Sequence, residues 1–209
     1  MITTRSAFTR RTIEAYEQHQ SRFLRQWNTG TYKIPPHMKV WMSHLSKDGV
    51  LLDLGCGAGQ DARYLRRQGF SVYGVDLTWS FLQAANKRDP RLPLVQADMW
   101  RLPFLAQTFD GIWAAASVIH LSKVSAGDVF KKLWALTKPG GWLAITVMYG
   151  RQAGVLEDQW IPGRYLAKWF KAELSQTVKA EKWEVISLDR VENQERKGAW
   201  LNLLAKRPC

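Results

Sequence analysis

The chain has 209 residues, of which 46% are hydrophobic and 23% charged, a composition that fits one globular domain and excludes disorder throughout. No apolar run approaches the roughly 18 residues that a membrane span needs, and the N-terminus lacks the apolar stretch of a secretory signal. Only two cysteines are present, so a disulfide framework is implausible and a cytoplasmic location is expected, while the net charge of +12 is spread along the chain without a basic block.

The first predicted elements are one or two amphipathic helices within residues 1–28. From residue 50 onward, short apolar runs that end in turn signals alternate with amphipathic stretches, which is the pattern of parallel strands joined by helices. Strands are predicted at 50–54, 71–75, 94–97, 109–115 and 142–148, and helices at 60–68, from Thr78 or Ser80 to Asn86, and at 125–137. This alternation predicts a doubly wound α/β sheet.

The C-terminal part departs from this alternation. Residues 164–174 predict a helix, and residues 183–189 and 199–205 predict two strands that are antiparallel because a short polar turn joins them. Mixed polarity and three glycines favour a mobile lid at 149–164. We find no repeat or linker and expect a single domain, divided into a helical cover, a ligand-binding core and a C-terminal lid, helix and strand pair, at 1–45, 46–150 and 151–209.

The segment Asp53 to Gly59, DLGCGAG, joins the first strand to the first helix of the alternating part. Glycines let a chain turn tightly and let backbone N–H groups approach a ligand, and this place in an open α/β sheet is where ligands bind. The third glycine comes one position earlier than in the dinucleotide-binding pattern G-x-G-x-x-G. Asp53 and Asp61 flank the turn and would repel phosphate, so the sequence predicts a nucleoside-like ligand without phosphates.

Two further acids follow the next two strands. Asp76 ends the second strand, 21 residues after Gly55, where a carboxylate can accept hydrogen bonds from both hydroxyls of a ribose. Asp98 ends the third strand, where it can accept a hydrogen bond from the amino group of an adenine. Because parallel strands end at the same edge of a sheet, we expect Asp53, Asp76 and Asp98 to converge on one crevice.

These residues resemble the class I S-adenosylmethionine-dependent methyltransferases. VLLDLGCGAGQ is similar to their glycine-rich first motif, GVDLT to the ribose-binding motif, QADMWRLPF to the segment around adenine, and LTKPGGWLAITV to the late helix–turn–strand. The resemblance covers residues 45–148 and implies a three-layer, Rossmann-like fold: a seven-stranded, mostly parallel sheet with an antiparallel last strand and an N-terminal helical cover.

The resemblance also implies roles for individual residues. The glycines would pass beneath the methionine part and the ribose, Asp53 would hold the ammonium group, Asp76 the ribose, and Asp98 with the N–H of Met99 the adenine. Cys56 is interpreted as part of the turn and not as a nucleophile, and Leu77 as packing either on the adenine or in the core. The expected cofactor-binding residues are Asp53, Gly55, Cys56, Gly57, Gly59, Asp76, Leu77, Asp98, Met99, Ala114 and Ala115, and no metal is expected.

The chemistry implied is in-line displacement of the sulfonium methyl of S-adenosylmethionine, which leaves S-adenosylhomocysteine. Such a step needs orientation above all, and a base only where the acceptor must lose a proton. His120 follows the fourth strand and is the candidate, either as that base or as a structural histidine near the cofactor. Candidates for the acceptor pocket are Tyr16, Phe23, Trp27, Trp113, Tyr149, Arg151, Trp160, Arg164, Tyr165 and Trp169.

The acceptor itself is left open by the sequence. Aromatic and arginine side chains suit an aromatic or anionic small molecule, which is the preferred interpretation. A tRNA wobble-base methyltransferase is the alternative, since +12 would serve RNA, although we see no basic cluster along the chain. A non-catalytic S-adenosylmethionine-binding protein is an alternative of another class. No membrane association is expected, and nothing in the sequence determines the oligomeric state.

Overall fold

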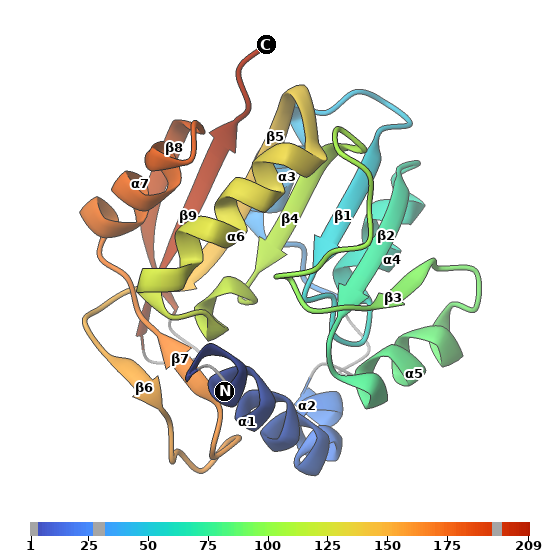
Figure 1. The fold of residues 1–209 in the computed structure, drawn as a ribbon. Coiled ribbons are helices and arrows are strands. Elements are labelled where there is room, and N and C mark those ends of the chain that lie inside the picture. Colours follow the sequence, from blue (N-terminus) through green and yellow to red (C-terminus); the bar gives the residue numbers. More distant parts are fainter. Residues whose placement is uncertain (1–3, 27–31, 194–197) are drawn as a thin grey trace.

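The computed structural model describes residues 4–26, 32–193 and 198–209 (Figure 1). Seven strands form one sheet in the order β3-β2-β1-β4-β5-β9-β8. Their bounds are β1 Val50–Leu54, β2 Ser71–Asp76, β3 Leu94–Gln96, β4 Phe109–Ala115, β5 Thr137–Met148, β8 Glu184–Asn193 and β9 Gly198–Lys206. The pairs among β1 to β5 are parallel and β9 is antiparallel to both β5 and β8, which confirms the predicted fold class.

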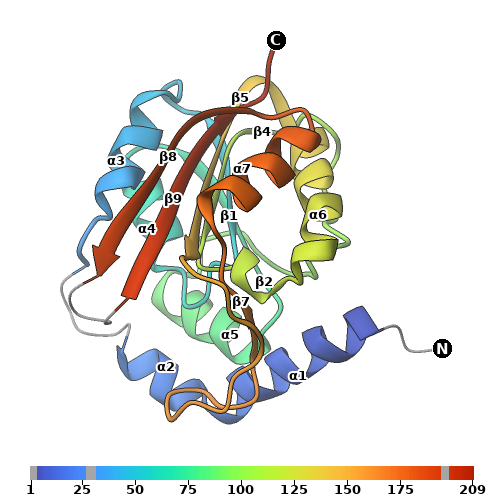
Figure 2. The ribbon, with the colours of Figure 1, turned by 90° about the vertical axis from the view of Figure 1, so that its left-hand side faces the viewer.

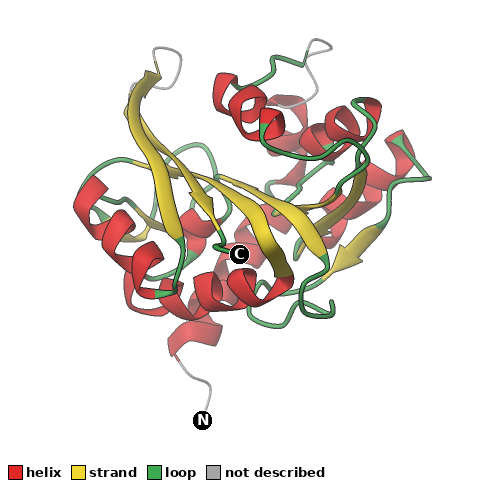
Figure 3. Cartoon of the chain, turned by 90° about the horizontal axis from the view of Figure 1, so that it is seen from above, coloured by secondary structure: helices red, strands yellow, loops and turns green. Residues whose placement is uncertain are grey.

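Helices cover both faces of the sheet, as Figure 2 shows. On one face lie α3, Pro36–Ser43, and α4, Gln60–Arg67, with α5, Trp79–Arg88, beside α4 at the β3 edge. On the other face lie α6, Lys123–Leu136, and α7, Lys171–Ala180. Seen from above in Figure 3, the strands form the layer between the helices. Among the described helices, none combines the length and the apolar character needed to cross a membrane.

Strand β1 shows why the sheet is buried on both faces. Its neighbours Leu51 and Leu52 are both fully buried, but Leu51 packs in the cluster with Trp41 and Trp113 beneath α3 and α4, and Leu52 in the cluster with Phe130 beneath α6. Successive side chains of a strand point to opposite faces, so a continuous apolar run is what a doubly covered strand requires.

Two N-terminal helices cover the edge at which the parallel strands end (Figure 1). They are α1, Thr4–Gln18, and α2, Gln20–Gln26, in agreement with the prediction for residues 1–28. A separate two-stranded antiparallel sheet of β6, Ala153–Val155, and β7, Tyr165–Ala167, lies beside α1. The short 3-10 helix η1, Val118–His120, follows β4 and contacts β7.

Two predictions of local structure were wrong or incomplete. Residues 164–174 are not one helix: β7 pairs with β6, and α7 begins only at Lys171, where Glu173 Oε2 accepts the N–H of Phe170 at 3.0 Å. A short apolar run looks the same in a buried strand and in a helix, and the pairing with β6 decides it. Helix α3 was not predicted, although Pro36 at its first position is a typical helix start.

Candidate functional site

The turn after β1 has the backbone geometry that only glycine adopts easily. Gly55, Gly57 and Gly59 have φ values of +77°, +51° and +71°. The N–H groups of Gly55 and Cys56 both donate to the carbonyl of Val75, at 2.7 and 2.9 Å, and so fix the turn against the end of β2. A Cβ on Gly55 would lie 2.3 Å from the Cβ of Ser117, so the segment after β4 can approach the turn only because residue 55 has no side chain.

Asp53 lies beneath this turn and is 2% exposed. Its Oδ2 is buried and has no hydrogen-bond partner among the described residues, and the Ser117 Oγ is in the same condition. Burial, and next the nearby charge of Asp61, raise the pKa of Asp53 well above its ordinary value. A buried carboxylate with an unpaired oxygen is costly unless a partner arrives, and a cationic group such as an ammonium would supply that partner.

Asp76 ends β2 with both carboxylate oxygens placed by the backbone. Oδ2 accepts the N–H of Gly57 and Oδ1 accepts the N–H of Thr78, each at 2.8 Å. The second contact is local and the first joins β2 to the glycine turn, so the carboxylate has a fixed orientation beside the turn. Burial raises the pKa of Asp76, against the effect of these hydrogen bonds. Each oxygen retains acceptor capacity for a ligand hydroxyl.

The remaining predicted cofactor residues surround the same edge. Asp98 lies two residues beyond β3, and its Oδ1 accepts the N–H of Trp100 at 3.0 Å. Met99 packs against the core and Ala114 is fully buried, while Ala115 is partly buried at the end of β4. Leu77 is partly buried and its carbonyl accepts from Gln96 at 3.1 Å. The structure thus gathers these residues at the ends of β2, β3 and β4.

Cys56 points away from the ligand side of the turn. Its sulfur would lie 3.0 Å from a Cβ on Gly74 of β2, and burial raises the pKa of its thiol well above the ordinary value. A buried thiol without a nearby cation stays protonated and is a poor nucleophile. The Cys56 side chain thus packs against β2, and its interpretation as part of the turn and not as a nucleophile stays a prediction.

His120 is held on both sides by the N-terminal cover and the small sheet. Its Nδ1 lies 2.7 Å from the carbonyl oxygen of Tyr165, which can only accept, so Nδ1 carries the proton. Nε2 lies 3.0 Å from the Tyr16 hydroxyl and accepts from it. Burial lowers the pKa of His120 to about 4, and the hydrogen bond to Tyr165 offsets only part of this effect. The imidazole is neutral near pH 7 and joins α1, η1 and β7.

Aromatic rings from the cover pack over the glycine turn. The Phe23 ring would lie 3.4 Å from a Cβ on Gly57, and it stacks on Phe81 of α5 with 4.2 Å between centroids. Tyr16 meets Phe23 and Phe81 edge to face at 5.7 and 5.6 Å. Trp160 lies 6.1 Å from Phe23. These four rings, which we call the aromatic cover, bring α1, α2 and the loop between β6 and β7 together.

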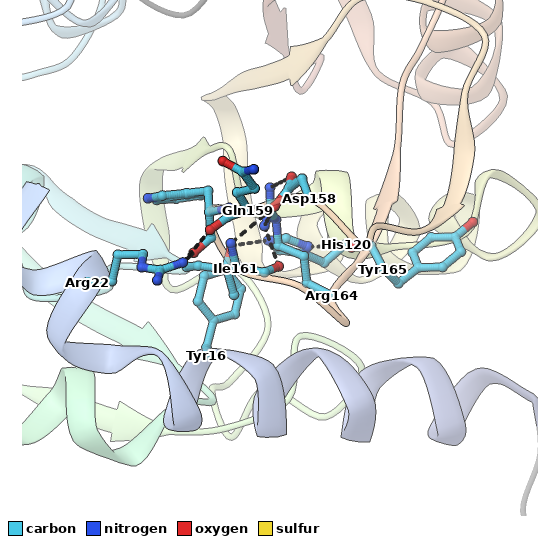
Figure 4. A network of polar contacts seen from close by, with 9 residues as sticks. Tyr16, Arg22, His120, Asp158, Gln159, Ile161, Arg164 and Tyr165 are labelled. Atoms are coloured by element: carbon cyan, nitrogen blue, oxygen red, sulfur yellow. Dashed lines mark hydrogen bonds and ion pairs between the residues drawn. The ribbon is translucent and has the colours of Figure 1, made fainter.

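The β6–β7 loop is fixed by Arg164, whose role differs from the predicted one. Arg164 is 6% exposed, and its guanidinium pairs with both oxygens of Asp158, at 3.0 and 2.7 Å. It also donates to the Ile161 carbonyl at 2.5 Å (Figure 4). It stacks on Trp160 at 4.8 Å. Arg22 of α2 donates to the backbone carbonyls of Gln159 and Trp160. Arg164 therefore shapes the loop, and α2 is tied to it.

Other predicted acceptor residues lie in different settings. Trp169 and Trp113 are each 1% exposed and belong to the two core clusters. Tyr149 packs against Phe170 and beneath Arg190, and Arg151 is exposed. Trp27 lies outside the described residues. Of the described residues in this group only Trp113 reaches the turn, through the bond from its indole N–H to Asp61, whereas Tyr16, Phe23 and Trp160 gather over the turn.

The sequence placed Asp61 beside the turn but did not predict its partners, Tyr32 and Trp113. Asp61 accepts the Tyr32 hydroxyl at 2.5 Å and the Trp113 indole N–H at 2.6 Å. These contacts give both carboxylate oxygens of Asp61 a hydrogen-bond donor and hold Asp61 near Asp53. Of the two acids, Asp53 is therefore the one with an unpaired oxygen among the described residues. The position of Asp61 just after the glycines was visible in the sequence, but its partners come from segments 29 and 52 residues away.

The known proteins that this chain resembles in sequence are methyltransferases. Residues 52–145 match the family model described as a methyltransferase domain. The chain is 31% identical over 110 residues to a malonyl-[acyl-carrier protein] O-methyltransferase of Enterobacter lignolyticus, covering 53% of this chain and 43% of that protein. It is 31% identical over 153 residues to a 2-phytyl-1,4-naphtoquinone methyltransferase of Thermosynechococcus vestitus, covering 69% and 65%. The chain thus spans less than two thirds of the length of either relative.

A solved structure agrees over the whole chain. The 1,6-didemethyltoxoflavin-N1-methyltransferase of Burkholderia thailandensis, with bound 1,6-didemethyltoxoflavin and S-adenosylhomocysteine, has a TM-score of 0.81 and 20% identity, and the match covers 100% of this chain and 92% of that one. At this identity the similarity establishes the fold, and it extends the match beyond residues 52–145 to the cover and the C-terminal strands.

Proposed function

Through residues 52–145 the chain belongs to the class I S-adenosylmethionine-dependent methyltransferases, and from this premise we propose that it transfers a methyl group from S-adenosylmethionine to a small-molecule acceptor. The observation that carries the proposal is the unpaired, buried Oδ2 of Asp53 beneath a left-handed glycine turn, with the carboxylate of Asp76 fixed beside it. These two carboxylates offer anionic acceptor oxygens to an ammonium group and to the hydroxyls of a ribose.

In the proposed mechanism the residues bind and orient. Bound S-adenosylmethionine supplies a methyl group already activated on a sulfonium. Asp53 would hold the ammonium and Asp76 the ribose hydroxyls. Asp98 with the N–H of Met99 would hold the adenine, and Leu77 would pack against it. Gly55 and Gly57 let the backbone pass close to the cofactor, and Ala114 and Ala115 line the methionine end. The aromatic cover would exclude water. Orientation of the acceptor against the methyl group can lower the activation barrier by roughly 7–11 kcal/mol.

We assign His120 to positioning and not to proton removal. With Nδ1–H on the Tyr165 carbonyl and Nε2 on the Tyr16 hydroxyl, its ring is already engaged at both nitrogens. A pKa of about 4 also makes it a weak base near pH 7. Its contacts suit a residue that holds α1 and β7 over the transfer site. We expect His120→Gln to change KM and to leave the shape of the kcat–pH profile intact. Loss of the acidic limb of that profile in this variant would instead identify His120 as the base.

The preference for a small acceptor rests on the aromatic cover and on the relatives. Tyr16, Phe23 and Trp160 present rings where an acceptor would meet the methyl group, and aromatic walls suit a flat or apolar molecule. The names of both relatives above specify acceptors other than RNA, an acyl group on a carrier protein and a quinone.

Cofactor binding is the first test. S-adenosylhomocysteine at 100 times its Kd should stabilise the folded chain by about 2.7 kcal/mol. For a chain of this size that corresponds to a melting shift of roughly 5–10 °C. Asp76→Asn should remove the shift because an amide can no longer accept from both ribose hydroxyls. Asp110→Asn, at the start of β4 and away from the turn, is the control and should keep it. Absence of any shift in the unaltered protein would disprove the proposal.

Acceptor class is the second test. Methyl-labelled S-adenosylmethionine should transfer label to a component of a small-metabolite extract and not to total tRNA. If label enters only tRNA, the proposal of a small-molecule acceptor is wrong and the acceptor is RNA. A clear melting shift with no label in either pool would favour the non-catalytic binding protein.

A further inference from the structure

A cluster of arginines forms where the C-terminal ends of α4 and α5 meet, joined by the ion pair of Arg66 with Asp89. The stretches 60–68 and 83–91 together carry six basic residues, Arg63, Arg66, Arg67, Lys87, Arg88 and Arg91, and two acids, Asp61 and Asp89. Asp61 is occupied by Tyr32 and Trp113. The sequence separates the two basic stretches, and the packing of α5 beside α4 brings them together.

One ion pair places the end of α5 against α4. Arg66 pairs with Asp89, whose other oxygen accepts the N–H of Arg91 at 3.1 Å. This contact brings Arg88, one residue before Asp89, next to the α4 surface that bears Arg63 and Arg67, which lie four residues apart on one side of the helix. Burial, then the positive charges of Arg88 and Arg67, lower the pKa of Arg63, so Arg88 and Arg67 each lie within electrostatic reach of Arg63.

Arg88 has a guanidinium nitrogen in this cluster without a hydrogen-bond acceptor in the described part of the chain. Its Nη1 is buried and has no hydrogen-bond partner among the described residues. A guanidinium nitrogen withdrawn from water costs free energy unless an acceptor replaces the water, and neighbouring positive charges add to that cost. Asp89 does not satisfy it, because Asp89 is committed to Arg66 and to the backbone of Arg91. An anion with several acceptor oxygens would satisfy Arg88 and neutralise its neighbours together.

We propose that Arg63, Arg67 and Arg88 form a phosphate-binding site, separate from the cofactor crevice, that takes a phosphate group of a ligand or partner. Arginine is suited to this group because its planar guanidinium donates two parallel hydrogen bonds to phosphate oxygens. The site also has a short link to the cofactor turn: Arg63 Nε donates to the carbonyl of Gly59 at 3.1 Å. A phosphate drawn to Arg63 would act on a residue that braces the third glycine.

The test uses the full chain and three probes at constant ionic strength: inorganic phosphate, pyrophosphate and total tRNA. Arg67 is exposed, so Arg67→Gln should fold normally; Arg88→Gln removes the buried nitrogen, and Arg88→Lys keeps the charge without the planar fork. Lys179→Gln, which removes one exposed charge from α7 on the opposite face, is the matched control.

We expect pyrophosphate to raise the melting temperature of the unaltered chain and of Lys179→Gln, and the Kd to weaken about tenfold or more in Arg67→Gln and Arg88→Gln. Arg88→Lys should weaken binding as well. Response to the small anions indicates a free phosphorylated ligand, and response to tRNA alone indicates the phosphates of a nucleic acid. Equal affinity in all variants, or an equal loss in Lys179→Gln, would overturn the proposal. S-adenosylhomocysteine binding, measured on the same variants, should persist, which keeps this outcome separate from that of the proposed function.

Discussion

At residue 55 the turn requires glycine for two separate reasons, and a pair of alanine variants separates them. Both Gly55 and Gly69 have positive φ, +77° and +99°, but a Cβ on Gly55 would meet Ser117 at 2.3 Å, whereas a Cβ on Gly69 has nothing within 4 Å. Gly69→Ala should therefore lose about 1–2 kcal/mol from backbone strain alone. Gly55→Ala should lose at least about 3 kcal/mol and its cofactor affinity, because Ser117 must also move. Urea unfolding measures both, and equal losses would contradict the role given to Ser117.

Single residues were predictable where their function depends on a strand end. The ends of β1 and β2 follow from apolar runs in the sequence, so Asp53 and Asp76 could be placed at one edge of the sheet. Ser117 and Tyr32 could not, because their contacts with Gly55 and Asp61 arise from segments that meet only in the folded chain. Arg164 shows the opposite error: its residue type suggested an anionic acceptor, while its contacts with Asp158 and Ile161 lie inside its own loop.

At the scale of elements, α2 and the β6–β7 loop form one cover, because Arg22 bonds the carbonyls of Gln159 and Trp160 (Figure 4). We expect Arg22→Ala to loosen this cover and to speed S-adenosylhomocysteine release about three- to tenfold. This change corresponds to a loss of roughly 1 kcal/mol of binding free energy. The melting temperature should change little, since exposed contacts contribute little to global stability. Stopped-flow displacement measures the rate. Arg25→Ala, exposed on the same helix, is the control, and an identical rate in both variants would exclude Arg22 as the link.

Elements were predictable to the extent that periodicity distinguishes them. The alternating part from β1 to β5 was predicted because each strand there is a short, mainly apolar run and the helices between them are amphipathic. The segment 164–174 was not, since Tyr165–Ala167 forms a strand only through pairing with β6, a contact with no local sequence signal. The cover itself was predicted as helices, but its attachment through Arg22 and His120 is a tertiary feature.

At the scale of the whole molecule, the charge of +12 is spread in the sequence and locally concentrated in the fold. The buried acids Asp53, Asp61 and Asp76 lie at the glycine turn, while arginines of α4 and α5 gather where these two helices are joined by the Arg66–Asp89 ion pair. The absence of a basic block along the chain was therefore a poor guide to the surface. Charges from two helices form a cluster when their helices pack side by side, and this pairing is set by the topology of the sheet.

The same buried groups determine how stability depends on pH. Burial lowers the pKa values of His37 and His120 to about 4, below the ordinary 6.5, so the folded chain holds both neutral while the unfolded chain protonates them. Their contribution is complete above pH 6.5 and is lost as the pH falls toward 4. At about 1.4 kcal/mol per pKa unit, each histidine accounts for up to about 3 kcal/mol. Asp53 and Asp76, whose pKa values are raised, act in the opposite sense, since the folded chain gains stability as they are protonated.

Because these effects overlap, the curve of the unaltered protein cannot identify the histidines, but a difference between variants can. His120→Gln and His37→Gln leave the acids in place. The free energy of unfolding of each variant, subtracted from that of the unaltered chain, should be constant above pH 7 and should fall by up to about 3 kcal/mol between pH 6.5 and 4. Urea unfolding across this range measures the difference. A difference independent of pH would mean that the folded chain protonates the histidine as readily as the unfolded chain, and the neutral link between Tyr16 and the Tyr165 carbonyl would then be wrong.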